Sequence, residues 1–263
     1  MKYMKKIELA CWEDYKNIIS NDIYDRAHGP LYRGQANSAW RLETTLDRIQ
    51  PSYNIKKYYQ RLNKINDDLN SCYGIKHDLS EFEVNKEFHS KYNLKTCAFM
   101  AYVRHLGFQS PLLDWTRSPY IAAYFAFQEL INNTTHIAIY KYTENSYGTS
   151  TRDNIMEPYI YFLSSHIFTH KRHYLQQSQY TTCKAGCETD PIFGLHEKAN
   201  LDGKSQSIVK YILPVSERKN ILTELLKMNI HSFSLFATEE SLVHSMAVQE
   251  FVIAHRQIKG SSS

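Results

Sequence analysis

The strongest constraint on the fold is an apolar run of eight residues, 120–127, which directly follows Ser118-Pro119. Ser is a favoured helix N-cap and Pro fits the first helical turn, so the pair predicts that a helix begins here. The predicted helix, residues 120–130, is apolar on almost all sides, which indicates burial in a core. The run is far shorter than the ~20 residues that a membrane span needs, so we expect no membrane partner.

Helix and strand patterns interleave elsewhere without a regular strand–helix–strand rhythm. Helical patterns occur at residues 12–19, 56–69, 80–107 and 216–228, the last two beginning with capping signals at Ser80 with Glu83 and at Ser216. The expected apolar faces are Phe99, Val103 and Leu106, and Ile221, Leu225 and Met228. Strand-like patterns occur at residues 31–33, 137–142 and 208–213, and residues 243–255 fit either a core strand or an edge for a partner. The 263 residues allow one large domain or two small ones, no repeat or linker divides them, and the interleaved pattern favours an α+β fold.

A first cluster of potential chemical importance is Leu31-Tyr32-Arg33-Gly34-Gln35, a short strand with an Arg followed by Gly. The Arg guanidinium presents five donors in a rigid fork, which suits a phosphate or a carboxylate. The Gly allows another backbone to approach closely. The alternative is a structural Arg paired with a core carboxylate.

A second cluster runs from Arg104-His105 through Asp114-Trp115-Thr116 to Ser118. Asp114, Thr116 and Ser118 alternate through a turn that leads into the buried helix. The free amides and the positive dipole end of a helix N-terminus favour anionic or hydrogen-bonding ligands. The alternative is structural, with Ser118 capping the helix, Asp114 holding the loop and Trp115 packing in the core.

Residues 158–187 contain no Asp or Glu, although the whole chain is only weakly basic at +4. Basic and aromatic residues alternate there, including Lys171, Arg172, His173, Tyr174 and Tyr180. This composition suits a phosphate-bearing ligand with stacking bases, so we expect these five residues to bind nucleic acid. The alternative is a surface hairpin with a chance run of charge. Within the stretch, residues 176–181 form a polar strand whose amides suit a ribose and an acceptor group.

Other common sites lack support. Cys183, Cys187 and His196 have no second ligand pair at zinc-finger spacing, so we expect no metal. Walker A, Gly-x-Gly-x-x-Gly, Gly-x-Ser-x-Gly and His-Glu-x-x-His motifs do not occur. The five Cys show no framework spacing, and acidic residues follow the basic residues 1–6 without an apolar segment. These features predict a reduced, cytoplasmic compartment.

Taken together, these clusters resemble the FRG domain family, which is named for a Phe-Arg-Gly triplet. Tyr32-Arg33-Gly34 matches the triplet, and Leu42, Leu46 and Arg48 match a following Leu…Leu…Arg run. Residues 105–116 and 123–126 are similar to the central His-His-Gly…Leu-Leu-Asp-Trp-Thr signature and its Ala-x-Tyr-Phe-Ala helix. Residues 176–181 resemble a Gln-Gln-Gly-x-Phe-Thr motif, and residues 208–214, 221–226 and 235–237 resemble the family's tail.

The sequence departs from the family pattern in four places. Tyr32 replaces the Phe of the triplet, and Leu106 replaces the second His of the central signature. The Pro-Thr-Arg of that signature is Gln109-Ser110-Pro111, which removes a potential phosphate contact. Ser178 replaces the Gly that follows the paired Gln, which alters the expected bend beside Gln177.

The resemblance implies an ADP-ribosyltransferase-like fold, with a split mixed or antiparallel β core flanked by helices. Because the resemblance covers nearly the whole chain, it implies a single domain, residues 30–245, with residues 1–29 as a helical extension and residues 246–263 as a strand or tail. It also implies an NAD site, with NAD as co-substrate. The residues implied to bind NAD are Tyr32, Arg33, Gly34, Gln35, His105, Asp114, Thr116, Ser118 and Tyr124. The implied catalytic residues are Arg33, Gln177 and Gln179, where Gln179 replaces an expected Glu; Glu157 and Glu250 are potential substitutes for that Glu.

The implied function is an NAD-dependent ADP-ribosyltransferase that acts as a toxin or phage-defence effector and releases nicotinamide. The acid-free stretch favours a nucleic acid as acceptor, with RNA preferred over DNA. A toxin also implies an antitoxin protein as partner. The alternatives are a binding module for NAD or ADP-ribose without catalysis, a transferase acting on protein, and a different enzyme such as an NAD glycohydrolase or a nuclease.

Overall fold

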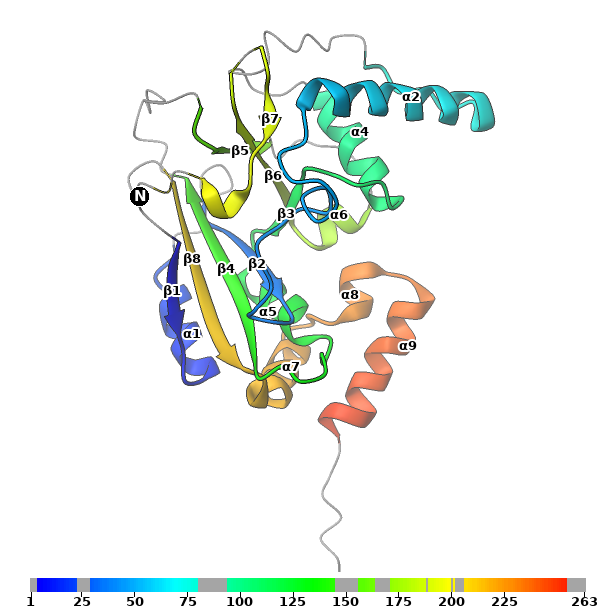
Figure 1. Ribbon diagram of the computed structural model, residues 1–263. Helices are drawn as coiled ribbons and strands as arrows, with labels where there is room; N and C mark the ends of the chain where they lie inside the picture. The colour runs from blue at the N-terminus through cyan, green and yellow to red at the C-terminus, as the bar shows by residue number, and fades with distance from the viewer. Residues whose placement is uncertain are drawn as a thin grey trace, which may run out of the picture.

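The computed structural model describes residues 4–22, 29–79, 94–144, 156–163, 171–187, 189–199, 201 and 206–254. Its centre is a mixed sheet of eight strands with the order β1-β8-β4-β2-β3-β6-β5, and β7 pairs with β6 (Figure 1). The strands are β1 (Lys5–Glu8), β2 (Leu31–Gln35), β3 (Leu113–Thr116), β4 (His136–Glu144), β5 (Tyr159–Leu163), β6 (Ser178–Ala185), β7 (Ile192–Phe193) and β8 (Gln206–Pro214). β1 and β8 are parallel and the other pairs are antiparallel. This arrangement confirms the α+β class.

The helices pack against the sheet in two groups. The α-helices are α1 (Trp12–Ile19), α2 (Ile55–Tyr73), α4 (Leu94–His105), α5 (Pro119–Phe127), α6 (Lys171–Leu175), α7 (Arg218–Lys227), α8 (Ser232–Phe236) and α9 (Glu239–Val248), followed by a π-helical turn, Gln249–Ile253. α1, α5 and α7 share one apolar core with β4 and β8, whereas α2 and α4 share another with β5 and β6. No helix in the described ranges is long and apolar enough to cross a bilayer.

Alternation along the strands separates two faces of the sheet. On β2, Tyr32 packs into the core that contains α5, and the next side chain, Arg33, lies on the other face. We call the face on which Tyr32 lies the helical face, and the face on which Arg33 lies the Arg33 face. A third core on the Arg33 face includes Trp115 and Tyr140 and is covered by loop residues such as Leu42.

The sheet separates between β2 and β3. Tyr32 and Thr116 form the only residue pair between these strands in the described structure, whereas β2 pairs with β4 along its whole length. Beyond this pair the strands diverge, and the Arg33 guanidinium reaches from β2 to the Asp114 backbone carbonyl of β3. The two groups of strands are therefore joined at one point, directly beside the strongest functional candidate.

Several local expectations are confirmed. The helix at residues 12–19 is α1, the strand at 31–33 is part of β2, and the strand at 208–213 is part of β8. Ser118 is the N-cap of α5, and its hydroxyl accepts a hydrogen bond from the Ile121 amide. α5 is almost completely buried but ends at Phe127, so its last predicted turn, residues 128–130, is not helical.

Other local expectations are wrong. Leu106 and Met228 are exposed rather than part of apolar faces, because α4 ends at His105 and α7 at Lys227. Glu217, not Ser216, is the N-cap of α7, which is not the last helix. Residues 243–253 are helical. The expectation of a core strand or a partner edge at residues 243–255 is therefore wrong over this range, and so is the strand expected at residues 246–253.

The remaining observations concern the acid-free stretch and the N-terminal segment. In the acid-free stretch β5 and β6 pair antiparallel, and every residue of β6 is buried, so the surface-hairpin alternative fails for residues 178–185. The capping signal at Ser80 and Glu83 lies outside the described residues. The N-terminal segment is integrated into the fold: β1 pairs with β8, and Trp12 and Tyr15 of α1 are buried in the helical-face core. All five Cys are described, and each is a free thiol.

Candidate functional site

Arg33 lies where β2 and β3 diverge, opposite Tyr140 of β4. Its Nη1 donates to the backbone carbonyl of Asp114 at 2.8 Å, and its buried Nε has no hydrogen-bond partner among the described residues. Burial lowers the pKa of Arg33 to about 10, with Asp114 opposing the shift and Arg104 and Arg48 adding to it. The guanidinium is therefore still a cation at neutral pH, with donor capacity that the described protein does not use.

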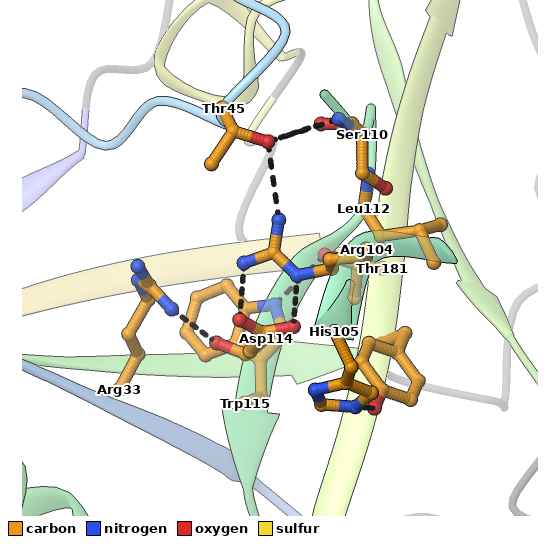
Figure 2. A network of polar contacts seen from close by, with 10 residues as sticks. Arg33, Thr45, Arg104, His105, Ser110, Leu112, Asp114, Trp115 and Thr181 are labelled. Carbon is orange, nitrogen blue, oxygen red and sulfur yellow. Dashed lines mark hydrogen bonds and ion pairs between the residues drawn. The ribbon is translucent and has the colours of Figure 1, made fainter. Parts of the chain in front are cut away.

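Arg104 of α4 holds the Asp114 carboxylate with two hydrogen bonds (Figure 2). Its Nε lies 2.8 Å from Oδ1, and its Nη2 binds Oδ2. Burial raises the pKa of Asp114, but the bonds and charge of Arg104 and the charge of Arg33 outweigh it and keep the pKa below its usual range. The Arg104 side chain is 13% exposed and the Asp114 side chain 38%, so the pair is partly open to solvent.

A loop between β2 and α2 contributes a further layer above this pair. Thr45 Oγ1 lies 3.4 Å from Arg104 Nη1 and accepts from the Ser110 amide at 2.9 Å (Figure 2). Arg48, on the same loop, is near enough for its charge to lower the pKa of Arg33. Arg48 and Arg104 are thus close enough to Arg33 for their charges to act on it, while Arg104 holds the Asp114 carboxylate, and this positive charge favours an anion.

Thr116 and Ser118 make structural contacts. The Thr116 hydroxyl donates to the Gln176 carbonyl at 2.8 Å and accepts from the Ser118 amide at 3.1 Å. Ser118 caps α5, and Trp115 is buried with its indole N–H bonded to Thr181. These contacts are the ones expected from the structural interpretation of this cluster, and Asp114 likewise holds Arg104. These contacts position α5 at the end of β3. A ligand role for Thr116 and Ser118 stays a prediction.

The two catalytic candidates on β6 and its preceding turn differ in environment. Gln177 is exposed, with a left-handed backbone at φ 49°. Gln179 is buried on the Arg33 face, directly opposite Trp115, and its Oε1 has no partner among the described residues. Of the pair, only Gln179 shares a face with Arg33. Glu157 lies exposed before β5 and Glu250 lies exposed in the π-helical turn after α9.

The predicted NAD-binding residues are divided between the two faces. Tyr32 and Gly34 face α5, and Tyr124 is buried within α5, whereas Gln35 lies on the Arg33 face. Gly34 has a clear structural role: a Cβ there would lie 2.0 Å from the carbonyl oxygen of Ala122. The sheet therefore places Arg33, Gln35 and Gln179 on one face, and Tyr32, Gly34 and Tyr124 on the other.

The predicted nucleic-acid residues form a partly exposed group around α6. Tyr174 is 85% exposed, Lys171 is exposed, and Arg172 lies over the Phe236 ring at 5.5 Å. Tyr180 is buried and is no part of an exposed stacking surface; its ring stacks on His173 at 5.6 Å, and its hydroxyl lies 3.2 Å from Nε2 of His105. The described group thus offers cations and one exposed aromatic ring.

Two side chains beside the site were not among the predicted site residues. Arg104 stands next to His105 in the sequence, but only the fold shows that it is the partner of Asp114. The sequence indicates His196 only as a weak candidate zinc ligand. In the structure it is completely buried and hydrogen-bonded to Thr181 on the Arg33 face. The described residues contain no group of three or more His, Cys, Asp or Glu arranged to hold a metal ion.

The fold and the site define an α+β protein with a cationic site at the point where its sheet divides. Residues 29–135 match the FRG domain, which supports the FRG family for this part of the chain. The match includes Arg33, His105, Asp114, Thr116 and Ser118, but ends before Gln177, Gln179 and His196. No curated protein and no solved structure shows significant similarity to the chain.

Proposed function

We propose that the chain is an NAD-dependent ADP-ribosyltransferase of the toxin or phage-defence type, with NAD bound at Arg33 and a nucleic acid as acceptor, RNA favoured over DNA. The observation that supports the site most directly is Arg33, a cation with a buried Nε that has no partner in the described structure. A dinucleotide supplies the anion that this fork and its neighbours Arg48 and Arg104 favour.

In the proposed reaction the bond between the ribose C1′ and the nicotinamide nitrogen breaks. Its electron pair leaves with neutral nicotinamide. An oxygen or nitrogen nucleophile of the acceptor then forms a bond to C1′, the carbon with oxocarbenium-like character. The nucleophile loses its proton to solvent. The contribution of Arg33 is to bind the diphosphate and orient the ribose, which lowers the barrier by positioning. The acceptor side is supported by the basic group of Lys171, Arg172 and the exposed Tyr174.

A second candidate is a module that binds NAD or ADP-ribose without turnover. It is favoured by a specific observation: β6 offers the amide of Gln179 on the Arg33 face, and an amide does not stabilise a developing positive charge as a carboxylate does. Both candidates need the same anion site, and they differ in whether nicotinamide is released. A transferase acting on protein shares this site and differs in its acceptor.

The test is incubation of the purified chain with adenylate-labelled NAD and, in parallel, RNA, DNA and cell-extract protein. We expect label on RNA, with weaker label on DNA, and nicotinamide released in equal amount. Arg33→Ala should reduce transfer by about 100- to 1,000-fold if loss of the buried fork is felt fully in the transition state.

The matched control is Arg61→Ala. Arg61 lies on α2, binds the Tyr53 hydroxyl and contacts its ring at 5.8 Å, away from the divergence of β2 and β3. Arg61→Ala should retain transfer when both variants are assayed at a temperature at which each is folded. Calorimetric binding of NAD without release of nicotinamide would select the binding module. Label confined to NAD with all three acceptors would refute the transferase.

A further inference from the structure

His196 is a completely buried imidazole at the start of a short 3₁₀ helix, His196–Lys198. It ends a chain of hydrogen bonds that begins at Trp115 on β3 and passes through Thr181 on β6. The Trp115 indole N–H donates to Thr181 Oγ1 at 2.8 Å, and Thr181 Oγ1 lies 3.0 Å from Nε2 of His196. Figure 2 shows Trp115 and Thr181 on the strands beside Arg33.

The hydrogen count along this chain indicates the tautomer. An indole N–H only donates, so Thr181 Oγ1 accepts from Trp115. The hydroxyl hydrogen of Thr181 has no acceptor among the described residues other than Nε2 of His196, so we assign it to that bond. The imidazole then carries its hydrogen on Nδ1. Burial, together with the charge of Arg33, lowers the pKa of His196 to about 3, so the ring is neutral at physiological pH. Nδ1 has no hydrogen-bond partner among the described residues.

Three other buried polar atoms on the Arg33 face share this condition. Arg33 Nε is an unused donor, and Gln35 Oε1 and Gln179 Oε1 are unused acceptors. Gln179 lies opposite Trp115 and two residues before Thr181, so its side chain and the hydrogen-bonded chain share a face. Gln35 and Arg33 are likewise two residues apart on β2. A buried polar atom without a partner is rare in native proteins, and four of the ten in the described structure belong to this face, an arrangement that suits a ligand or ordered water.

We propose that Nδ1–H of His196 donates to an uncharged oxygen of the ligand held by Arg33, so that His196 is a specificity-determining residue of that site. The inference rests on the proposed function for the location of the ligand. Two donors and two acceptors fit a group that both donates and accepts hydrogen bonds, namely a ribose diol or a carboxamide. The Trp115–Thr181 chain fixes the direction in which the imidazole donates.

A pair of substitutions separates ligand contact from structural support. His196→Asn retains an amide near the position of Nδ1 and loses the partner of Thr181. His196→Gln retains a partner near Nε2 and loses the donor at Nδ1. Binding of ADP-ribose, which carries the diol, and of nicotinamide, which carries the carboxamide, is measured by calorimetry for both variants, with thermal unfolding to confirm that each is folded.

We expect His196→Asn to bind one of the two probes within about 3-fold of the wild-type chain and His196→Gln to lose about 10-fold, the loss of one neutral hydrogen bond. The probe that responds identifies the group. The reverse order, with His196→Gln retained and His196→Asn weakened, would show that His196 acts only through Thr181 and would overturn the proposal.

Nuclear magnetic resonance of ¹⁵N-histidine in the unaltered chain gives a test that needs no variant. The His196 ring should show a proton on Nδ1, and its resonance should shift when the responding probe is added. A proton on Nε2, or a ring resonance unmoved by millimolar ADP-ribose and nicotinamide, would mean that the unpaired atoms hold water and would refute the inference. If the probes bind as expected but no label transfers from NAD, the transferase fails while the role of His196 stands.

Discussion

Gly34 is the position at which one methyl group should have the largest effect on the fold. A Cβ added there would lie 2.0 Å from the carbonyl oxygen of Ala122 and 2.6 Å from the amide nitrogen of Ala126, both backbone atoms of α5. Because backbone atoms cannot rotate away, α5 would have to retreat from β2 by at least about 1 Å. The retreat would open the core in which α5 contacts Tyr32 and Ile139.

We therefore expect Gly34→Ala to lower the free energy of unfolding by about 3 kcal/mol or more, the upper end of the range for overpacking. For a chain of this size that corresponds to a fall of roughly 6–12 °C in Tm. The measurement is urea and thermal unfolding followed by circular dichroism. Arg33 should be displaced with β2, so ligand binding is expected to weaken as well.

Gly74→Ala is the matched control. Gly74 is the C-cap of α2 at φ 67°, and a Cβ there meets nothing within 4 Å. This substitution should cost about 1 kcal/mol, from the left-handed backbone alone. If Gly34→Ala were no more destabilising than Gly74→Ala, α5 would not lie directly on β2, and the account of the triplet's Gly would be refuted.

Two further predictions concern the ion pair and the turn before β6. Asp114→Asn should destabilise the fold by about 2–3 kcal/mol, below the 3–5 kcal/mol of a fully buried pair because the carboxylate is 38% exposed. Because the folded pKa of Asp114 is depressed, the stabilisation is complete above the unfolded pKa of ~3.9 and is lost as pH falls through the lower folded value. Urea unfolding of both chains should therefore show a constant difference at neutral pH that shrinks below about pH 4; a difference independent of pH would contradict the pairing. Gln177→Gly should raise stability by about 0.5–1 kcal/mol, because relief of the left-handed φ of 49° exceeds the added chain entropy. The same change at Gln176 should destabilise, and a loss of Tm at both positions would show that Gln177 is not strained.

The elements that the sequence predicts well are those with local causes. The Ser118-Pro119 cap and the apolar residues after it define α5 without reference to the rest of the chain. α9 shows why other elements were missed. It buries Ser241 and Ser245 and exposes Leu242, Val243 and Met246, so its apolar residues do not mark the packed face. The Ser245 hydroxyl accepts from the Phe233 amide of α8, and polar packing of this kind leaves no hydrophobic period.

The candidate site depends on pairing between distant segments, which no local pattern encodes. Arg33 and Asp114 are 81 residues apart, and they meet because Tyr32 pairs with Thr116 just before the strands diverge. The motif around each residue was recognisable, whereas the contact between them was not. Arg104 and His196 were missed as site residues for the same reason: each is identified by its partner, Asp114 or Thr181, and not by its sequence neighbours.

The order Tyr32-Arg33-Gly34 follows from the geometry of a strand between two different layers. Successive side chains of a strand point to opposite faces. The residue that lets a helix pack closely on one face is therefore next in sequence to a residue that faces the site on the other. Gly34 admits α5 on one face, and Arg33 presents its guanidinium on the other. Tyr32, on the helical face, adds a hydroxyl that binds Asp22 at the end of the N-terminal segment, and Lys141 of β4 binds the same carboxylate. A Phe at position 32 would lack this bond, so the Tyr gives β2 a direct polar connection to the segment that contains β1 and α1.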